Sequence, residues 1–465
     1  MLIKTVLTTA LAVAFGVPAA ASAAGDGELA QIREQIRQMK ESYESRIQAL
    51  EKRLADAEAR SETKTQNAPP PAIAAAPAAA ITSATTSLTA FNPAIALILG
   101  GTYANLSQDP NRYRLQGFVP SGDGVGPGKR SFNLGESELT LSANIDPRFA
   151  GQLTFSLAAD NSVSVEEAFF QTLGLSNGLN AKAGRFLSSV GYLNSQHAHA
   201  WDFVDAPLAY QAFFGGQYKP DGVQLKWLAP TERFFEVGLE AGNGTAFPGN
   251  DRNKNGIGSS ALFAHLGDDI GAGASWRAGL SYFKTSAANR TYADTDQTGA
   301  TVTNAFSGNS HLWIADAIYK WAPNGNPVDT NFKLQGEYFR RKESGTLTYD
   351  TLSQSLGSAS APYASAQSGW YLQGVYQFMP MWRVGLRYDK LYSGTADIGN
   401  LNPAAFARLA SYNPKRSTLM VDYSGSEFSR FRLQYARDQA RPGVTDNQIF
   451  LQYIMSLGVH GAHTF

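Results

Sequence analysis

The chain has 465 residues, with 39 Lys and Arg against 39 Asp and Glu, no Cys, 44 Gly and a high share of aromatic residues. The balanced charge argues against a nucleic-acid-binding protein, and 43% hydrophobic residues are too few for a bundle of transmembrane helices. The absence of Cys excludes a disulfide scaffold, a Cys-based zinc site and a Cys nucleophile.

Residues 1–23 have the pattern of a secretory signal peptide. Lys4 precedes an apolar run from Val6 to Val17, and Pro18 is followed by small residues that include Ala21-Ser22-Ala23. The apolar run is roughly a dozen residues long, whereas a transmembrane helix needs ~20. We therefore expect cleavage after Ala23 and export of the mature chain.

Residues 24–62 predict an α-helical coiled coil in the periplasm. Apolar residues recur about every 3.5 positions from Leu29 to Ala57, with one stutter, and charged helix formers lie between them. Ile at both kinds of core position favours three strands, so we expect a homotrimer. A monomeric helix packed on the rest of the chain remains the alternative, because about four heptads is a short seam.

Residues 63–92 predict a Pro/Ala-rich linker, in which Pro69, Pro70, Pro71 and Pro77 break any long helix. From residue 93 to 465 about sixteen segments alternate between large apolar and polar residues, which is strand periodicity. In residues 382–389, for example, one parity is Trp, Val, Leu and Tyr, and the other is Arg, Gly, Arg and Asp. This region therefore predicts an all-β domain.

The connections between these segments tend to alternate in length. We predict short turns at residues 145–149, 175–178, 229–233, 267–273, 322–329, 379–381 and 424–427. Long loops are predicted at residues 108–133, 187–221, 285–308, 342–368 and 392–416, whereas 159–164 and 439–446 are short. Strands of this length with such connections are typical of an antiparallel transmembrane β-barrel of about 16 strands, with a polar lumen and an apolar lipid face.

A soluble sandwich or propeller would show the same alternation along each strand. The export signal and the C-terminal Phe465 favour the barrel instead. So do aromatic residues near the ends of the predicted strands, which resemble interfacial girdles: Tyr103, Trp227, Trp276, Tyr319, Trp370, Trp382 and Tyr388.

Several short motifs resemble those of Gram-negative outer-membrane porins, especially the phosphate-selective porin family. They are Glu167-Ala168-Phe169-Phe170, Gly178-Leu179, Ala183-Gly184-Arg185-Phe186 and Gly191-Tyr192. The closing His463-Thr464-Phe465 is similar to the signal read by the barrel assembly machinery. The resemblance covers about residues 90–465. It implies a passive trimeric channel for small hydrophilic solutes in the outer membrane, without a cofactor. A lysine-rich phosphate ladder is not evident, so the solute stays open.

The strand parity predicts which charged residues line the lumen. Nine are basic: Lys182, Lys226, Arg277, Lys333, Arg341, Arg383, Arg387, Arg430 and Arg432. Five are acidic: Glu236, Glu240, Glu337, Asp389 and Asp422. This mild basic excess predicts a weak preference for anions.

The loop at residues 187–221 is predicted to fold into the barrel as a pore constriction, because it is long and rich in aromatic residues. We expect Asp202 and Asp205 to face the basic ladder of Arg383, Arg387, Arg430 and Arg432 across the narrowest point. Alternatively, the aromatics cap the outer rim and touch a neighbouring subunit. His197 and His199 either bind a divalent metal ion or belong to a packed, hydrogen-bonded loop.

Other motifs carry less weight. Residues 174–178 match a nucleophile elbow, but a strand follows where the elbow requires a helix, and no catalytic constellation can be assembled. We therefore expect no enzyme. Asp251, Asn253 and Asn255 resemble half of a calcium loop, but Leu262 stands in place of the bidentate acid, so they are weak candidates for a metal site. The alternative functions are a TonB-dependent-type receptor, which needs a plug and about 22 strands, or a metal-related outer-membrane uptake protein.

Overall fold

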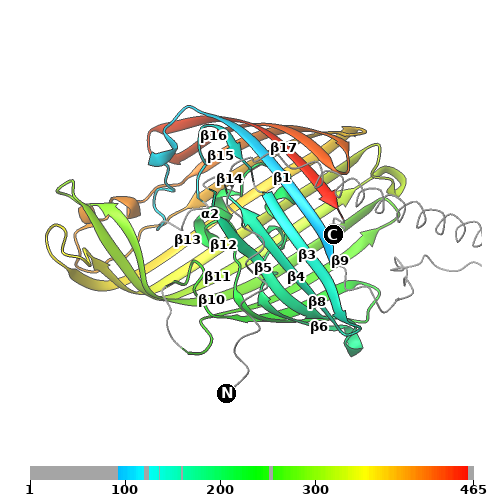
Figure 1. Ribbon diagram of the computed structural model, residues 1–465. Helices are drawn as coiled ribbons and strands as arrows, with labels where there is room; N and C mark the ends of the chain where they lie inside the picture. The colour runs from blue at the N-terminus through cyan, green and yellow to red at the C-terminus, as the bar shows by residue number, and fades with distance from the viewer. Residues whose placement is uncertain (1–92, 120–124, 136, 159–160, 251–254, 459–465) are drawn as a thin grey trace, which may run out of the picture. The chain divides into compact units, whose positions relative to one another are not determined.

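The computed structural model describes residues 93–465, except 120–124, 136, 159–160, 251–254 and 459–465. These residues form one closed antiparallel barrel, in which nearly every strand pairs with the next one along the chain (Figure 1). The barrel closes because β1 (Ala94–Leu106) pairs both with β17 (Val444–Gly458) and with β2 (Ser131–Leu134) and β3 (Ser137–Asp146). The predicted signal peptide, coiled coil, linker and C-terminal Phe465 all lie outside the described residues.

The 17 labelled strands fill 16 positions in the wall. β2 and β3 pair with successive parts of β1, so they form one wall strand interrupted around Gly135. A Cβ at Gly135 would lie 2.9 Å from the backbone of Gly100, so only glycine permits this close approach. The predicted strand number of about 16 is therefore confirmed.

The other wall strands follow in chain order, and short helices lie in the connections. The strands are β4 (Phe149–Leu157), β5 (Val163–Thr172), β6 (Leu179–Arg185), β7 (Asp221–Leu228), β8 (Phe234–Gly242), β9 (Ser259–Ile270), β10 (Ala274–Thr295), β11 (Thr301–Trp321), β12 (Asn331–Tyr349), β13 (Ala359–Met379), β14 (Trp382–Tyr392), β15 (Lys415–Ser426) and β16 (Ser429–Arg441). The helices are η1 (Pro110–Arg112), η2 (Ser176–Gly178), η3 (Leu193–Ser195), η4 (Ala198–Ala200), α2 (Leu208–Phe214), η5 (Pro323–Gly325), η6 (Pro403–Ala405) and η7 (Ala407–Leu409). Among the described residues, no helix combines the length and apolar character needed to cross a bilayer.

The alternation along the strands places apolar side chains outside and polar side chains inside. In β14, Leu386 is 64% exposed whereas Arg387 is 3% and Asp389 is 0% exposed. A soluble sandwich would bury the apolar parity, so this inverted burial favours a barrel whose outer face meets lipid.

Two of the predicted long loops are wrong. Residues 285–308 and 342–368 mostly continue strands β10 to β13, which are 19 to 22 residues long, and the actual connections are residues 296–300 and 350–358. These extensions are rich in Ser, Thr, Ala and Gly, a composition that resembles a loop. They are stabilised by ladder pairing and by a buried cluster that includes Val302, Phe306, Leu347 and Tyr363. The predicted short turns at residues 379–381 and 424–427 lie close to the observed turns between paired strands, at residues 380–381 and 427–428, but residues 424–426 belong to β15.

Candidate functional site

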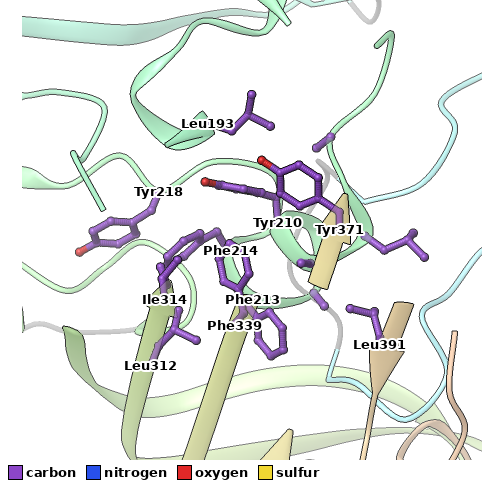
Figure 2. Packing of buried hydrophobic residues seen from close by; sticks show 14 of the residues in the cluster. Leu193, Tyr210, Phe213, Phe214, Tyr218, Leu312, Ile314, Phe339, Tyr371 and Leu391 are labelled. Atoms are coloured by element: carbon purple, nitrogen blue, oxygen red, sulfur yellow. The ribbon is translucent and has the colours of Figure 1, made fainter. Parts of the chain in front are cut away.

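The connection between β6 and β7, residues 186–220, lies inside the barrel. Its helix α2 is fully buried against the inner faces of β12, β13 and β14. The ring of Phe213 stacks on that of Phe339 at 5.7 Å, and the ring of Tyr210 meets Phe339 edge-on at 5.1 Å. Figure 2 shows these aromatic side chains gathered between the helix and the wall. Within the described residues, this packing places the aromatic side chains inside the barrel and not as a cap on its outer rim.

Glu337 on β12 is the main polar anchor of this inward loop. Its carboxylate accepts hydrogen bonds from the hydroxyls of Tyr210 at 2.9 Å and Tyr371 at 2.6 Å. It also accepts from the backbone N–H groups of Tyr192 at 3.1 Å and Leu193 at 3.0 Å. Because the site is buried, these four donors satisfy a carboxylate that would otherwise be costly to bury.

Gly191 allows the loop to approach Glu337 closely. Its φ is +71°, and a Cβ at this position would lie 2.3 Å from a carboxylate oxygen of Glu337. Any other residue would combine backbone strain with a steric clash. The Gly191-Tyr192 pair of the sequence motif therefore has a structural role at the anchor of the inward loop.

Asp202 and Asp205 connect the loop to the basic side of the wall. Asp202 lies 2.5 Å from Lys333 Nζ and 3.2 Å from Arg383 Nη1. Asp205 lies 2.9 Å from Arg387 Nη2 and 2.5 Å from Arg416 Nη1. Each carboxylate is thus shared by two basic side chains.

These ion pairs determine the protonation of the two aspartates. Burial by itself raises the pKa of each carboxyl group, but the adjacent positive charges outweigh burial. Lys333 and Arg383 hold the pKa of Asp202 below its ordinary value, and Arg416 and Arg387 do the same for Asp205. Both aspartates are therefore negatively charged at neutral pH.

The contact between the loop acids and the ladder differs from the predicted arrangement. The prediction has the aspartates facing the arginines across the narrowest point, whereas in the structure Asp202 and Asp205 contact Arg383 and Arg387 directly. Arg430 and Arg432 instead donate to the backbone carbonyl of Trp201, at 3.3 and 2.9 Å. The acids therefore fasten the loop to the ladder and neutralise part of its charge.

Arg416 belongs to this ladder but was not predicted to face the lumen, because the strand pattern placed it at the end of a loop. It lies at the start of β15, where it also donates to the carbonyl of Ala206 at 2.7 Å. Arg416 pairs with Asp389 of β14 and with Asp438 of β16, and this register places its side chain inside the barrel.

The other predicted wall residues also point inward. Lys182 Nζ lies 4.1 Å from the ring centre of Phe169, and Lys226 pairs with Glu236 at 3.1 Å. Arg277 lies over Tyr192 and 3.6 Å from Asp316. Arg341 donates to Gln367. Most of the inward basic residues are therefore already engaged within the barrel.

His197 and His199 lie together on the opposite side of the loop, against β3 and β5. The Nδ1 atoms of both histidines lie near the carboxylate of Glu138, at 3.1 and 3.0 Å. Nε2 of His197 lies 3.0 Å from Glu167, and Glu166 lies 3.8 Å from His197 Nδ1. None of these three glutamates was predicted as a site residue. The adjacent pair Glu166-Glu167 interrupts the apolar–polar alternation of the strand, and this interruption was the available sequence signal for the glutamates of this cluster.

Two cavities open near basic side chains. One of about 570 Å³ lies by the turns between β9 and β10 and between β11 and β12, and its lining includes Lys320, Lys333, Arg383 and Asp269. The other, of about 260 Å³, lies among the connections at the opposite ends of the strands. Four arginines line it: Arg112, Arg114, Arg408 and Arg441.

The remaining motifs form no site in the described residues. Residues 174–178 lie in the connection between strands β5 and β6, with Asn177 at φ 61°, which is a turn and not a nucleophile elbow. Asp251 and Asn253 lie outside the described residues, and Asn255 is exposed.

The closed barrel of 16 wall strands with an inward loop defines the fold as a large antiparallel β-barrel. The chain is 28% identical over 411 residues to an uncharacterised protein of Aquifex aeolicus, covering 82% of this chain and 81% of the relative. It is similar to the structure of a loop-deletion mutant of OmpT, an outer membrane protein of Vibrio cholerae, with a TM-score of 0.50 and 13% identity. That likeness covers 78% of this chain and 99% of the other, and supports the barrel fold.

The in-vitro folded trimer form of the same Vibrio cholerae protein matches with a TM-score of 0.49 and 12% identity, over 78% of this chain and 99% of that one. No family model matches the chain. The predicted membership of the phosphate-selective porin family therefore stays a prediction.

Proposed function

We propose that this protein is an outer-membrane porin through which small hydrophilic solutes diffuse passively, with a weak preference for anions. The observation that carries the proposal is the loop of residues 186–220, which lies inside a closed barrel and is fastened to its basic wall. A barrel with an apolar outer face and a charged interior suits a water-filled path across a lipid bilayer.

The preference for anions rests on the two cavities. The ladder arginines are largely neutralised by Asp202, Asp205 and Asp422. The lining of the smaller cavity has four arginines and no acidic residue, and two of them, Arg112 and Arg408, lie 3.8 Å from Asp109 and 3.9 Å from Asp294. The lining of the larger cavity has three basic residues against Asp269, and two of these, Lys333 and Arg383, are also paired with Asp202. Fixed positive charge at the two ends of a path raises the local concentration of anions and disfavours cations.

The assembly and location belong to the same proposal. The export signal, the residue pattern of the strands and the C-terminal Phe465 support insertion into the outer membrane by the barrel assembly machinery. The heptads of residues 24–62 support a homotrimer with its coiled coil in the periplasm. Outer-membrane lipid and hydrophilic solutes are then its partners.

Reconstitution tests the proposal directly. Liposomes containing the purified protein should swell in small sugars and progressively less in larger ones, and planar bilayers in a salt gradient should give a reversal potential on the anion side. Absence of both swelling and single-channel steps would contradict the pore. A reversal potential on the cation side would contradict only the preference for anions.

A TonB-dependent-type receptor fits less well, because the barrel has 16 wall positions where such receptors need about 22 strands. One specific observation favours the alternative of a metal-related uptake protein: His197 and His199 lie in a cluster with the buried Glu138.

A further inference from the structure

We propose that Glu138, His197 and His199, with Glu166 as the fourth ligand, form a binding site for one divalent transition-metal ion of the zinc class. The site would join the inward loop to strands β3 and β5. It does not depend on the solute or the selectivity of the pore.

The first support is the position of the nitrogen and oxygen atoms. One ligand atom from each of Glu138, His197 and His199 lies within 4.8 Å of the others. The two Nδ1 atoms approach the two oxygens of Glu138 at 3.1 and 3.0 Å. Ligands bound at about 2.0–2.2 Å to one tetrahedral zinc ion are separated by roughly 3.3–3.5 Å, so these distances need little adjustment. Imidazole and carboxylate together suit zinc, nickel, copper and cobalt.

The local backbone brings both imidazoles to one side. His197 immediately precedes the single turn of η4, and His199 lies within it. Their rings are stacked with centres 5.5 Å apart and planes 24° apart. A fully extended segment would separate the rings more widely along the chain, so the turn of η4 is what gathers them on Glu138.

The second support is an irregularity in β5 that points two consecutive glutamates inward. Thr154 of β4 pairs with Glu167, but the next residue, Phe155, pairs with Val165, so Glu166 is the extra residue of a β-bulge. Regular strand geometry would send Glu166 and Glu167 to opposite faces. The bulge redirects one of them, and Glu166 and Glu167 are 2% and 5% exposed.

The third support is a buried carboxylate oxygen that has no hydrogen-bond partner. Lys219 donates to Oε1 of Glu166 at 3.1 Å, while Oε2 of the same carboxylate has no hydrogen bond and lies 3.8 Å from Nδ1 of His197. Unsatisfied buried carboxylate oxygens are costly. A metal ion between His197 and Glu166 would satisfy this oxygen.

The charge of the cluster also calls for a cation. Three buried glutamates meet there, and among the described residues Lys219 is the one lysine that forms an ion pair with any of them, through Glu166. Glu167 contacts the distal Nε2 of His197 at 3.0 Å and accepts from the backbone N–H of Leu187 at 2.9 Å. A carboxylate on the far nitrogen of a ligating imidazole is the arrangement that orients metal-bound histidines.

The experiment uses the full chain purified in detergent, freed of metal with a chelator and dialysed. Zn²⁺ is added in a calorimetric titration, and Co²⁺ in a parallel absorption titration. We expect one equivalent per chain and a Co²⁺ spectrum with the intense bands of four- or five-coordinate sites. His197→Gln and His199→Gln should each weaken binding at least tenfold, and Glu166→Gln should alter the Co²⁺ spectrum.

His311→Gln is the matched control. His311 lies on the outward-facing parity of β11, and its imidazole hydrogen-bonds to the hydroxyl of Tyr282. The variant should bind Zn²⁺ like the wild type. Zn²⁺ should also raise the unfolding midpoint of the wild type and of this control, but not of His197→Gln. Should the histidine variants fail to fold, the wild-type Co²⁺ spectrum decides the question. Absence of stoichiometric binding, the weak spectrum of hexa-aquo Co²⁺, or undiminished binding by folded His197→Gln and His199→Gln would overturn the site.

Discussion

At the residue scale, Asp202 connects the inward loop to more of the wall than any sequence pattern indicated. It is 4% exposed, pairs with Lys333 and Arg383, and accepts a hydrogen bond from Gln373 at 3.0 Å. Three strands are thereby joined to one carboxylate. Removing that negative charge would leave Lys333 without this carboxylate partner and Arg383 with Asp422 alone, which is costly in a buried setting.

Asp202→Asn should therefore have two effects. The reversal potential should move further to the anion side, because Lys333 loses its carboxylate partner and Arg383 keeps only Asp422. The stability should fall by about 3–5 kcal/mol, the usual cost of breaking a buried ion pair. Bilayer recordings and urea unfolding measure these effects. Asp329→Asn, at an exposed turn, is the control and should change neither. An unchanged reversal potential for Asp202→Asn would remove this carboxylate from the ion path.

The lowered pKa of Asp202 predicts how the contribution of this carboxylate to the free energy of unfolding depends on pH. A carboxyl group whose pKa is depressed in the folded state stabilises fully above its unfolded pKa, here close to the ordinary 3.8. This contribution is lost only as the pH falls towards the lower folded value. The difference in unfolding free energy between wild type and Asp202→Asn should thus be the same at pH 7 and pH 5. A difference that shrinks clearly over this interval would show that the pKa is not depressed.

At the element scale, α2 holds the inward loop by aromatic packing as well as by charge. Its seven residues are all buried, and they contact three successive strands of the wall. A helix this short is not stable by itself. Its stability therefore comes from the cluster with Phe339, Tyr371 and Leu391 (Figure 2).

Phe213→Ala tests this packing. Phe213 is 0% exposed, and its loss should cost about 3–5 kcal/mol because the cavity cannot fully collapse. A loosened loop should make the single-channel current noisier and its mean conductance larger. Phe132→Ala, at a side chain that is 84% exposed, should leave the recordings unchanged. If the Phe213 variant folds and conducts like the wild type, the loop does not limit the current.

At the scale of the whole molecule, closure of the barrel and assembly of several barrels are separate questions. Closure follows from the pairing of β1 with β17 over 11 residue pairs. The seventeen strands expose apolar side chains on the outer face, which requires lipid or another apolar partner. Assembly rests on the heptads of residues 24–62, and it stays a prediction.

Deletion of residues 25–62 should lower the stability of the trimer without preventing barrel folding, because the strands do not need these residues to close. Semi-native gels at rising temperature report both the oligomer and the folded barrel. The intact chain with its linker is the reference. A trimer that melts at an unchanged temperature would indicate that the coiled coil only spaces the barrel from other structures.

The strand pattern by itself determined the barrel, the inward parity of residues such as Arg383 and Arg387, and the tight turns, because side-chain direction in a strand has a period of two that is local in sequence. It did not find the extensions of β10 to β13, whose small polar residues are held by pairing and not by composition. Nor did it find Arg416, or the joint approach of Glu166 and Glu167, which depends on one extra residue in β5. Contacts such as that of Asp202 with Arg383, 181 positions apart, were decided only by the tertiary structure, since the folding of the loop into the closed barrel is what brings such distant charges within bonding distance.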